Sequence, residues 1–550
     1  MSAPETEDAN LAITALIMSA VYDESPAQSL DEVYETLTTD SASIWESLDP
    51  LNLLSPLIAS SADAASKILK LMSDNCSPRE LILAADEVLE NISHSDSLNV
   101  DVTDDEHEND RRLLKNHQQV LRLMLIYKES ISRVPFRKRE LFSLESHNFD
   151  KTTGRQALHL GRDLASEILK WAEGKPGVSS DELAETKGIL SGYIESIIDS
   201  LANHIDASLA TKAFTLVYPR LLKRTSHNES DSINEIEIMP SLMTLYYQMR
   251  SSSPQTLPPT PTRATLLIYS QGLIERQSVE DSEKTLSFFL PVILATIQSN
   301  DPAVDATLSL LLLSLHSLVS SHSYLSPNLL IPLSTILPSL CVAHPNPDIR
   351  HYTFRSLSLL LKAAEPPLRM QILLDLTQDK QQGHSKMRTA SISLVREAVV
   401  EALDLENDKR IGIFASPLFL KEFGKIVLAP DPLDIFNKED REMTDDMKEE
   451  LGRLTECLAL YYVLIVRDKK NRIGILDKDN LANVERGLLK PMRNWLHARL
   501  KTSTSTEKGR AQRPYWTMIR TNDLVDLEAT MPLVALQVNL ERIDETLRRL

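Results

Sequence analysis

The fold is decided by residues 345–361, which read PNPDIRHYTFRSLSLLL. A turn containing two prolines leads into a segment that begins with Ile349-Arg350. Apolar residues then recur at the spacing that places them on one side of an α-helix, namely Phe354, Leu357, Leu360 and Leu361. The stretch therefore predicts a turn followed by a long helix with one apolar face.

The same pattern occurs at two further places in the chain. Val304-Asp305 lies 45 residues before Ile349-Arg350, and Met387-Arg388 lies 38 residues after it. HEAT and armadillo helical hairpins repeat at about 40–47 residues and bury their apolar faces only against neighbouring repeats. We therefore predict an all-α fold, an α-solenoid of HEAT/armadillo-like helical hairpin repeats.

The composition argues against an enzyme. The chain has 14 glycines in 550 residues, whereas average usage is about 7%. Loops that bind phosphates or dinucleotides need glycine where the backbone approaches the ligand. The sequence also contains no Walker loop and no HExxH, GxSxG, Rossmann or kinase motif. We predict no catalytic residue, no metal ligand, no cofactor and no small-molecule substrate.

Charge and cysteine usage limit the partners and the compartment. The net charge of −19 repels nucleic acid and anionic membranes on average. The three cysteines, Cys76, Cys341 and Cys457, form no disulfide pattern, as expected in a reducing compartment. The acidic N-terminal residues do not fit a secretion signal. We expect a cytoplasmic or also nuclear protein with protein partners, and no membrane or nucleic acid.

Shifts in composition divide the chain into successive segments. We predict N-terminal helical repeats over 1–250 with an acidic loop at 95–110, a Pro-rich hinge at 251–262, central HEAT-like repeats over 263–428, an acidic loop at 429–446, and C-terminal helical repeats with a cap over 447–550 that contain a basic loop at 501–520.

Two of these loops admit a second interpretation. Residues 95–110 form a solvated loop or, with His107, a divalent-cation site, although the spacing of an EF-hand is absent. Residues 501–520 are solvated or, through Tyr515-Trp516, contact nucleic acid by stacking. We favour the solvated loop in both cases.

The Pro-rich and uncharged segments can each be interpreted in two ways. Residues 251–262 form a plain linker or carry a proline-directed phosphorylation site at Ser253 or Thr260. Residues 306–347 contain no charged side chain, but prolines divide them into pieces too short to cross a bilayer. We expect helices buried on several sides there rather than a membrane span.

Cys76 is the most plausible reactive thiol of the three. It follows an Asp-Asn turn and precedes a predicted helix that starts at Ser77-Pro78. A helix N-terminus lowers the pKa of a nearby thiol and makes it more reactive. The alternative is an unreactive, partly buried cysteine, which is how we interpret Cys341 and Cys457.

Two segments of the chain together resemble one family. The first runs from His344-Pro345-Asn346-Pro347-Asp348-Ile349-Arg350 to the helix that opens with Met387-Arg388-Thr389-Ala390-Ser391-Ile392, and the second contains Arg467-Asp468, Asn471-Arg472-Ile473-Gly474-Ile475 and Leu488-Leu489-Lys490-Pro491-Met492-Arg493. They are similar to the family that unites fungal YAP-binding proteins with Alf-type and glomulin-type proteins of plants and animals. The Asn-Arg-x-Gly-Ile loop is the most specific part of the resemblance.

The resemblance implies an α-solenoid that binds partner proteins and has no catalytic activity. Fungal members are linked to the response of a bZIP transcription factor to peroxide, with a relative tied to kinetochores. An animal relative masks the RING subunit of cullin ubiquitin ligases. We therefore expect a bZIP transcription factor or a thiol peroxidase as partner, or alternatively a cullin RING subunit. Arg472, Gly474 and Ile475 are the candidate partner-binding residues.

Overall fold

The computed structural model describes most of the chain. The described residues are 4–23, 25–39, 48–98, 116–131, 133, 147–174, 179–202, 205, 207–221, 238–250, 256–277, 279–299, 301–378, 385–404, 412–437, 444–505 and 524–549. Over these ranges the regular elements are helices, and none is a strand. The predicted all-α, helical-repeat fold is confirmed.

The chain forms two compact units. The first comprises residues 1–280 and 288–313, and the second comprises 281–287 and 314–550. The predicted hinge at 251–262 is described only from residue 256 onward. There Leu257 and Pro258 line a small pocket together with Tyr246 and Tyr269 of the first unit.

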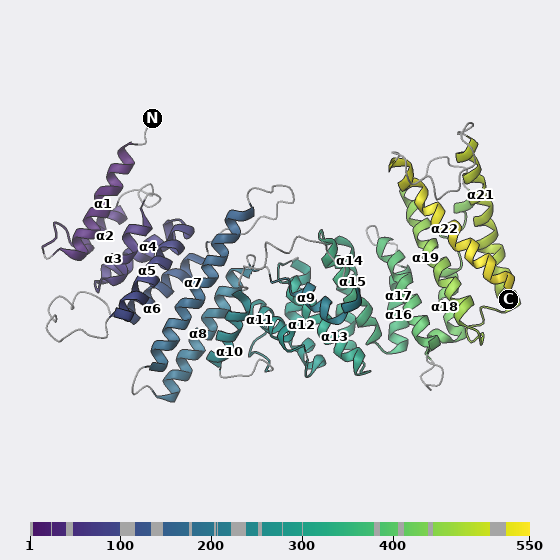
Figure 1. The fold of residues 1–550 in the computed structure, drawn as a ribbon, viewed down its shortest axis with the longest axis horizontal. Coiled ribbons are helices and arrows are strands. Elements are labelled where there is room, and N and C mark those ends of the chain that lie inside the picture. Colours follow the sequence, from purple (N-terminus) through teal and green to yellow (C-terminus); the bar gives the residue numbers. More distant parts are fainter. Residues whose placement is uncertain are drawn as a thin grey trace. The chain divides into compact units, whose positions relative to one another are not determined.

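The first unit stacks its helices in two layers (Figure 1). Its helices are α1 Pro4–Tyr22, α2 Leu30–Thr39, α3 Pro50–Ala59, α4 Asp63–Asn75, α5 Pro78–Leu98, α6 Asn116–Ile131, α7 His147–Gly174, α8 Ser180–Ser200, α9 Leu209–Val217, α10 Ile238–Arg250, α11 Arg263–Arg276, and parts of α12 Ser282–Ser299 and α13 Val304–Ser320. One layer contains α1, α3, α5, α7 and α10, and the other contains α2, α4, α6, α8 and α11. Each helix packs against its predecessor in the same layer and against its hairpin partner in the other, as expected for helical repeats.

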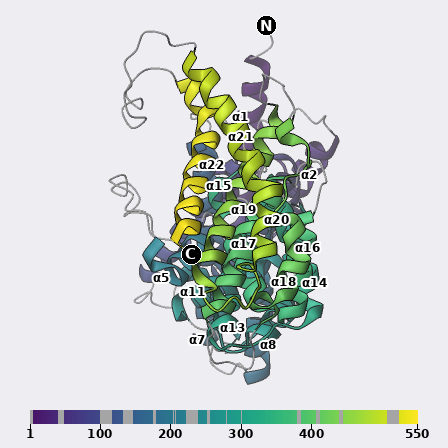
Figure 2. The ribbon, with the colours of Figure 1, turned by 90° about the vertical axis from the view of Figure 1, so that its right-hand side faces the viewer.

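The second unit also packs its helices as hairpin pairs. Its helices are α14 Pro327–Ala343, α15 Pro347–Lys362, α16 Pro366–Gln378, α17 Ser385–Asp404, α18 Pro417–Val427, α19 Asp445–Arg467, α20 Lys478–Val484, α21 Lys490–Ser505 and α22 Leu524–Arg549, with a π-helical turn at Glu485–Leu489 between α20 and α21. Helices α14, α16 and α18 lie on one side of the unit, and α15, α17 and α19 lie on the other (Figure 2).

The C-terminal part differs from the sequence prediction in one respect. Composition predicts a basic loop at 501–520, but α21 continues through Ser505. Residues 506–520, which include Tyr515-Trp516, lie outside the described residues.

The apolar face read from residues 345–361 lies in the core of the second unit. Leu357 and Leu360 have no exposed surface, and Leu361 is 2% exposed. The N-terminus of this helix is capped by Asn346, whose side chain accepts a hydrogen bond of 2.8 Å from the backbone N–H of Asp348. Helix periodicity therefore placed the buried face correctly.

The stretch without charged residues also forms helices. In α14 the leucines at 330, 333 and 337 are fully buried. Across the ranges given above, no helix is both long enough and apolar enough to span a bilayer.

We predict that Leu357→Asp lowers the free energy of unfolding by about 3–5 kcal/mol, because it places an unpaired charge in the core. The matched control is Leu433→Asp, since Leu433 is 78% exposed in the same unit. Urea denaturation followed by circular dichroism measures both changes. Equal stability of the two variants would refute the placement of this face.

Candidate functional site

The charged residue of each repeat motif binds the end of a neighbouring helix. Arg350 donates a hydrogen bond of 2.7 Å to the carbonyl oxygen of His344, and Arg388 donates one of 3.1 Å to that of Thr377. Asp305 instead accepts hydrogen bonds of 2.6 and 3.0 Å from the N–H groups of Leu209 and Ala210. Helix ends leave carbonyl groups unsatisfied at the C-terminus and N–H groups at the N-terminus, so the sign of each charge matches the helix end that it binds.

Arginines outside these motifs bind C-terminal carbonyl groups in the same way. A guanidinium is always charged and carries five donors, so it can bind several carbonyl oxygens of a last turn at once. These contacts are Arg122 with Ser60 after α3, Arg133 with Ser73 of α4 and Cys76 after it, Arg263 with Asp199 of α8, Arg453 with Ile426 of α18 and Ala429 after it, and Arg472 with Leu403 of α17. We call such a contact an arginine joint.

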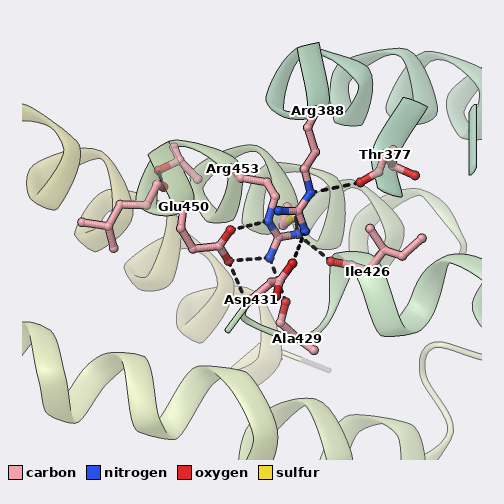
Figure 3. A network of polar contacts seen from close by, with 10 residues as sticks. Thr377, Arg388, Ile426, Ala429, Asp431, Glu450 and Arg453 are labelled. Atoms are coloured by element: carbon pink, nitrogen blue, oxygen red, sulfur yellow. Dashed lines mark hydrogen bonds and ion pairs between the residues drawn. The ribbon is translucent and has the colours of Figure 1, made fainter. Parts of the chain in front are cut away.

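The most buried arginine joint is that of Arg453, which is 1% exposed (Figure 3). Its Nε and Nη2 donate to the two carboxylate oxygens of Glu450 at 2.7 and 2.6 Å. Its Nη1 and Nη2 also donate to the carbonyl oxygens of Ile426 at 2.6 Å and Ala429 at 2.9 Å. Burial lowers the pKa of Arg453, but the hydrogen bonds and charge of Glu450 outweigh it, and the pKa lies above its usual value.

A second ion pair extends this network to other helices. The Nη2 of Arg388 lies 2.6 Å from the Asp431 carboxylate, and the backbone N–H of Asp431 donates to Glu450 at 2.9 Å. Because Arg388 also binds Thr377, the network connects α16, α17, the turn after α18 and α19 (Figure 3). Two cations face two carboxylates, and further donors of both arginines bind the backbone carbonyl groups of Thr377, Ile426 and Ala429. This is the arrangement of a structural connection between repeats.

The loop that carries the family resemblance is fixed by its own polar side chains. Asp468 is 1% exposed and accepts hydrogen bonds of 2.8 Å from the N–H groups of both Arg472 and Ile473. The side chain of Asn471 accepts one of 2.8 Å from the N–H of Leu476. Asn471 and Gly474 have φ angles of 49° and 84°, which are values that Asn and Gly tolerate best.

The three candidate binding residues of this loop have structural contacts. Ile475 has no exposed surface, and Arg472 forms an arginine joint of 2.6 Å with Leu403. A side chain at Gly474 would combine a positive φ with a Cβ only 3.2 Å from the Asp477 carboxylate. The residue types of this loop are therefore explained by its folding. A partner could reach Ile475 only if the loop opened.

Cys76 does not have the low pKa that the sequence suggested. It ends α4, where its N–H donates to Met72 at 2.9 Å, and it is 2% exposed. Burial, with a smaller contribution from the charge of Glu80, raises the pKa of its thiol to about 11. Desolvation of the thiol therefore outweighs the effect of the positive end of the following helix. Burial is also the largest cause that raises the pKa of Cys341 to about 12 and that of Cys457 to about 11.

The structure bears in part on the proposed cation and phosphorylation sites. In the described part of the chain, no group of His, Cys, Asp and Glu side chains is arranged to hold a metal ion. His107 and Ser253 lie outside the described residues. Thr260 is described and exposed, and its carbonyl oxygen accepts a hydrogen bond of 3.0 Å from Thr265.

We predict that Arg453→Met destabilises the protein by about 3–5 kcal/mol, because it leaves Glu450 buried without its cation. The control is Arg467→Met. The Arg467 side chain is 58% exposed, and its Nη1 forms an ion pair of 3.5 Å with Oδ1 of Asp404. Removing such an exposed pair costs about 0–1 kcal/mol. Chemical denaturation measures both values, and a cost below about 1 kcal/mol for Arg453→Met would show that the joint is not structural.

We also predict that the three thiols react slowly with a disulfide reagent such as DTNB near neutral pH in the folded protein. Their raised pKa values keep them protonated, and only the thiolate attacks. Addition of urea should release all three at the rate of unstructured cysteine. Rapid labelling of Cys76 without denaturant would contradict the burial described here.

A comparison with curated proteins found no match to this chain. The model of a family described as "Uncharacterised protein family, YAP/Alf4/glomulin" matches residues 159–538, which is more than half of the chain. The matched region contains the Arg453 joint and the loop at Asn471–Ile475, and it agrees with the resemblance drawn from these segments. The chain belongs to the YAP/Alf4/glomulin family.

Proposed function

We propose that this protein is a non-enzymatic helical-repeat scaffold that binds partner proteins and supports the response of a bZIP transcription factor to oxidative stress. Membership of the YAP/Alf4/glomulin family supports protein binding. The observation that supports the proposal is how the buried charged side chains are bonded. The buried charged side chains of the second unit, such as Arg453 and Glu450, bind one another and helix ends instead of facing an open pocket.

The state of the cysteines refines the part that this chain would have in such a response. All three thiols have raised pKa values caused mainly by burial, so they are poor nucleophiles toward peroxide near neutral pH. The reactive thiol would then belong to a partner, either the transcription factor or a thiol peroxidase. This chain would contribute the surface on which the two meet, in the cytoplasm or also in the nucleus.

A second candidate function is that of a glomulin-like protein, which binds the RING subunit of a cullin ubiquitin ligase and inhibits ubiquitin transfer. The family match extends through α19, α20 and α21 and into α22. Arg493 joins these C-terminal helices, because it forms ion pairs of 2.6 Å with both Glu485 and Asp544. A C-terminal end joined by such ion pairs suits a surface that covers a folded RING domain.

Affinity purification from cells that express the tagged protein, with and without brief peroxide treatment, tests the two candidates. We expect a bZIP factor or a thiol peroxidase to be enriched by peroxide. We expect the same enrichment with a variant that carries Cys76→Ser, Cys341→Ser and Cys457→Ser, because the reactive thiol lies in the partner.

Two results would change the proposal. Loss of the peroxide effect in the triple variant, provided that it is as stable as the wild type, would return the redox chemistry to this chain. Cullin and RING subunits in both samples would favour the second candidate.

A further inference from the structure

Positive charge is concentrated near the C-terminal end of this acidic chain. Residues 467–501 contain ten Lys and Arg but four Asp and Glu, whereas the whole chain contains 59 and 78. These residues comprise the end of α19, the Asn471–Ile475 loop, α20, the π-helical turn and most of α21. The sign of the charge is therefore reversed in this part of the protein.

Most of the carboxylates in this region have contacts inside the fold. Asp468 binds two backbone N–H groups of its own loop. The carboxylate of Asp477 accepts a hydrogen bond of 2.8 Å from a side chain of the same loop, and Glu485 forms an ion pair of 2.6 Å with Arg493. Among the four, Asp479 alone has no such contact with a described residue. Little negative charge therefore remains to offset the cations.

Four cations of the region are exposed and have no carboxylate partner among the described residues. We call them the basic surface; they are Lys469, Lys478, Arg486 and Lys490. Arg486 donates hydrogen bonds only within its own helical segment, to neutral groups three and four residues before it. The basic surface therefore presents its full positive charge to solvent.

Two of these cations lie on the outward side of a continuous helical segment. α20, the π-helical turn and α21 follow one another without a break. Leu488 and Met492 have no exposed surface and mark the inward side. Arg486 and Lys490 lie four residues apart and are both exposed, so they are neighbours on the outward side.

Gly487 lies next to Arg486 and is also exposed. A Cβ at this position would meet no atom within 4 Å, so packing within the chain does not require glycine here. Glycine lowers the stability of a helix relative to alanine. The missing side chain leaves room for the backbone of a bound segment to approach between the two cations.

We propose that the basic surface binds a segment rich in Asp and Glu in a partner protein. The inference rests on the proposed scaffold function and names the chemistry of the segment that is bound. Carboxylates form charge-assisted hydrogen bonds with Lys and Arg. Complementary charge also steers the encounter of two proteins and selects between partners. A partner with an acidic segment would be repelled by the rest of this acidic chain and directed to the basic surface.

Nucleic acid and anionic membranes fit this surface less well. Binding to single strands uses aromatic side chains that stack on bases, but the one Phe, Tyr or Trp residue in 467–501 is Trp495, which is 7% exposed. An amphipathic helix that lies on a membrane inserts its apolar side, and here Leu488 and Met492 of that side are buried in the fold.

Charge reversal on the full chain tests the proposal, with a short fluorescein-labelled Asp/Glu peptide as the probe and fluorescence anisotropy as the readout. We expect Arg486→Glu with Lys490→Glu to weaken binding of the peptide by about tenfold or more, because two attractive contacts become repulsive. The matched control is Lys421→Glu with Lys425→Glu on α18, where two exposed lysines have the same spacing. It changes the net charge equally and should bind like the wild type. Both variants should keep their thermal stability, since the replaced side chains are exposed.

Three results would overturn the proposal. They are no binding of the peptide by the wild type, equal losses in the two variants, and tighter binding of a single-stranded oligonucleotide or of phosphatidylserine vesicles than of the peptide.

Affinity purification from cells separates this inference from the scaffold function. We expect the Arg486→Glu, Lys490→Glu variant, unlike the control, to lose a partner that the wild type recovers. If it recovers every partner of the wild type, the surface is wrong and the scaffold function stands. If the wild type recovers no partner, the scaffold function itself fails, whatever the peptide shows.

Discussion

The packing of neighbouring repeats depends on arginine side chains. These side chains bind the C-terminal carbonyl groups of adjacent helices. Each helix ends with carbonyl groups that have no partner within the helix, and they carry a partial negative charge. Burial of apolar faces supplies most of the favourable free energy of folding, but it is not directional. Arg388, Arg453 and Arg472 add direction, because each fixes one helix end against the next element.

The fold class followed from the sequence, whereas the joints did not. The spacing of Ile349-Arg350 and Met387-Arg388 was enough to predict helical repeats, and the face around Leu357 is buried as expected. The role of Arg453 was hidden because Glu450 lies three residues before it, a spacing that is common on exposed helix surfaces. Only the tertiary structure shows that both side chains are buried and that the helix end they bind is that of α18.

The structure also shows contacts of the candidate site residues that the sequence does not reveal. The sequence indicated that Cys76 lies near a helix N-terminus, which lowers the pKa of a thiol. It did not show the burial, which raises that pKa more strongly. The Asn471–Ile475 loop appeared functional because its residue types are specific. In the structure the positive φ angles and the two bonds to Asp468 account for that specificity.

The central claim is that the buried Arg453–Glu450 pair stabilises the packing of the second unit. A double-mutant cycle on these two residues tests it most directly. We expect Arg453→Met and Glu450→Gln each to destabilise the second unit strongly. The double variant should lose much less than the sum of the two changes, because no unpaired charge remains. Additive losses would mean that the two side chains act independently, and would contradict this account.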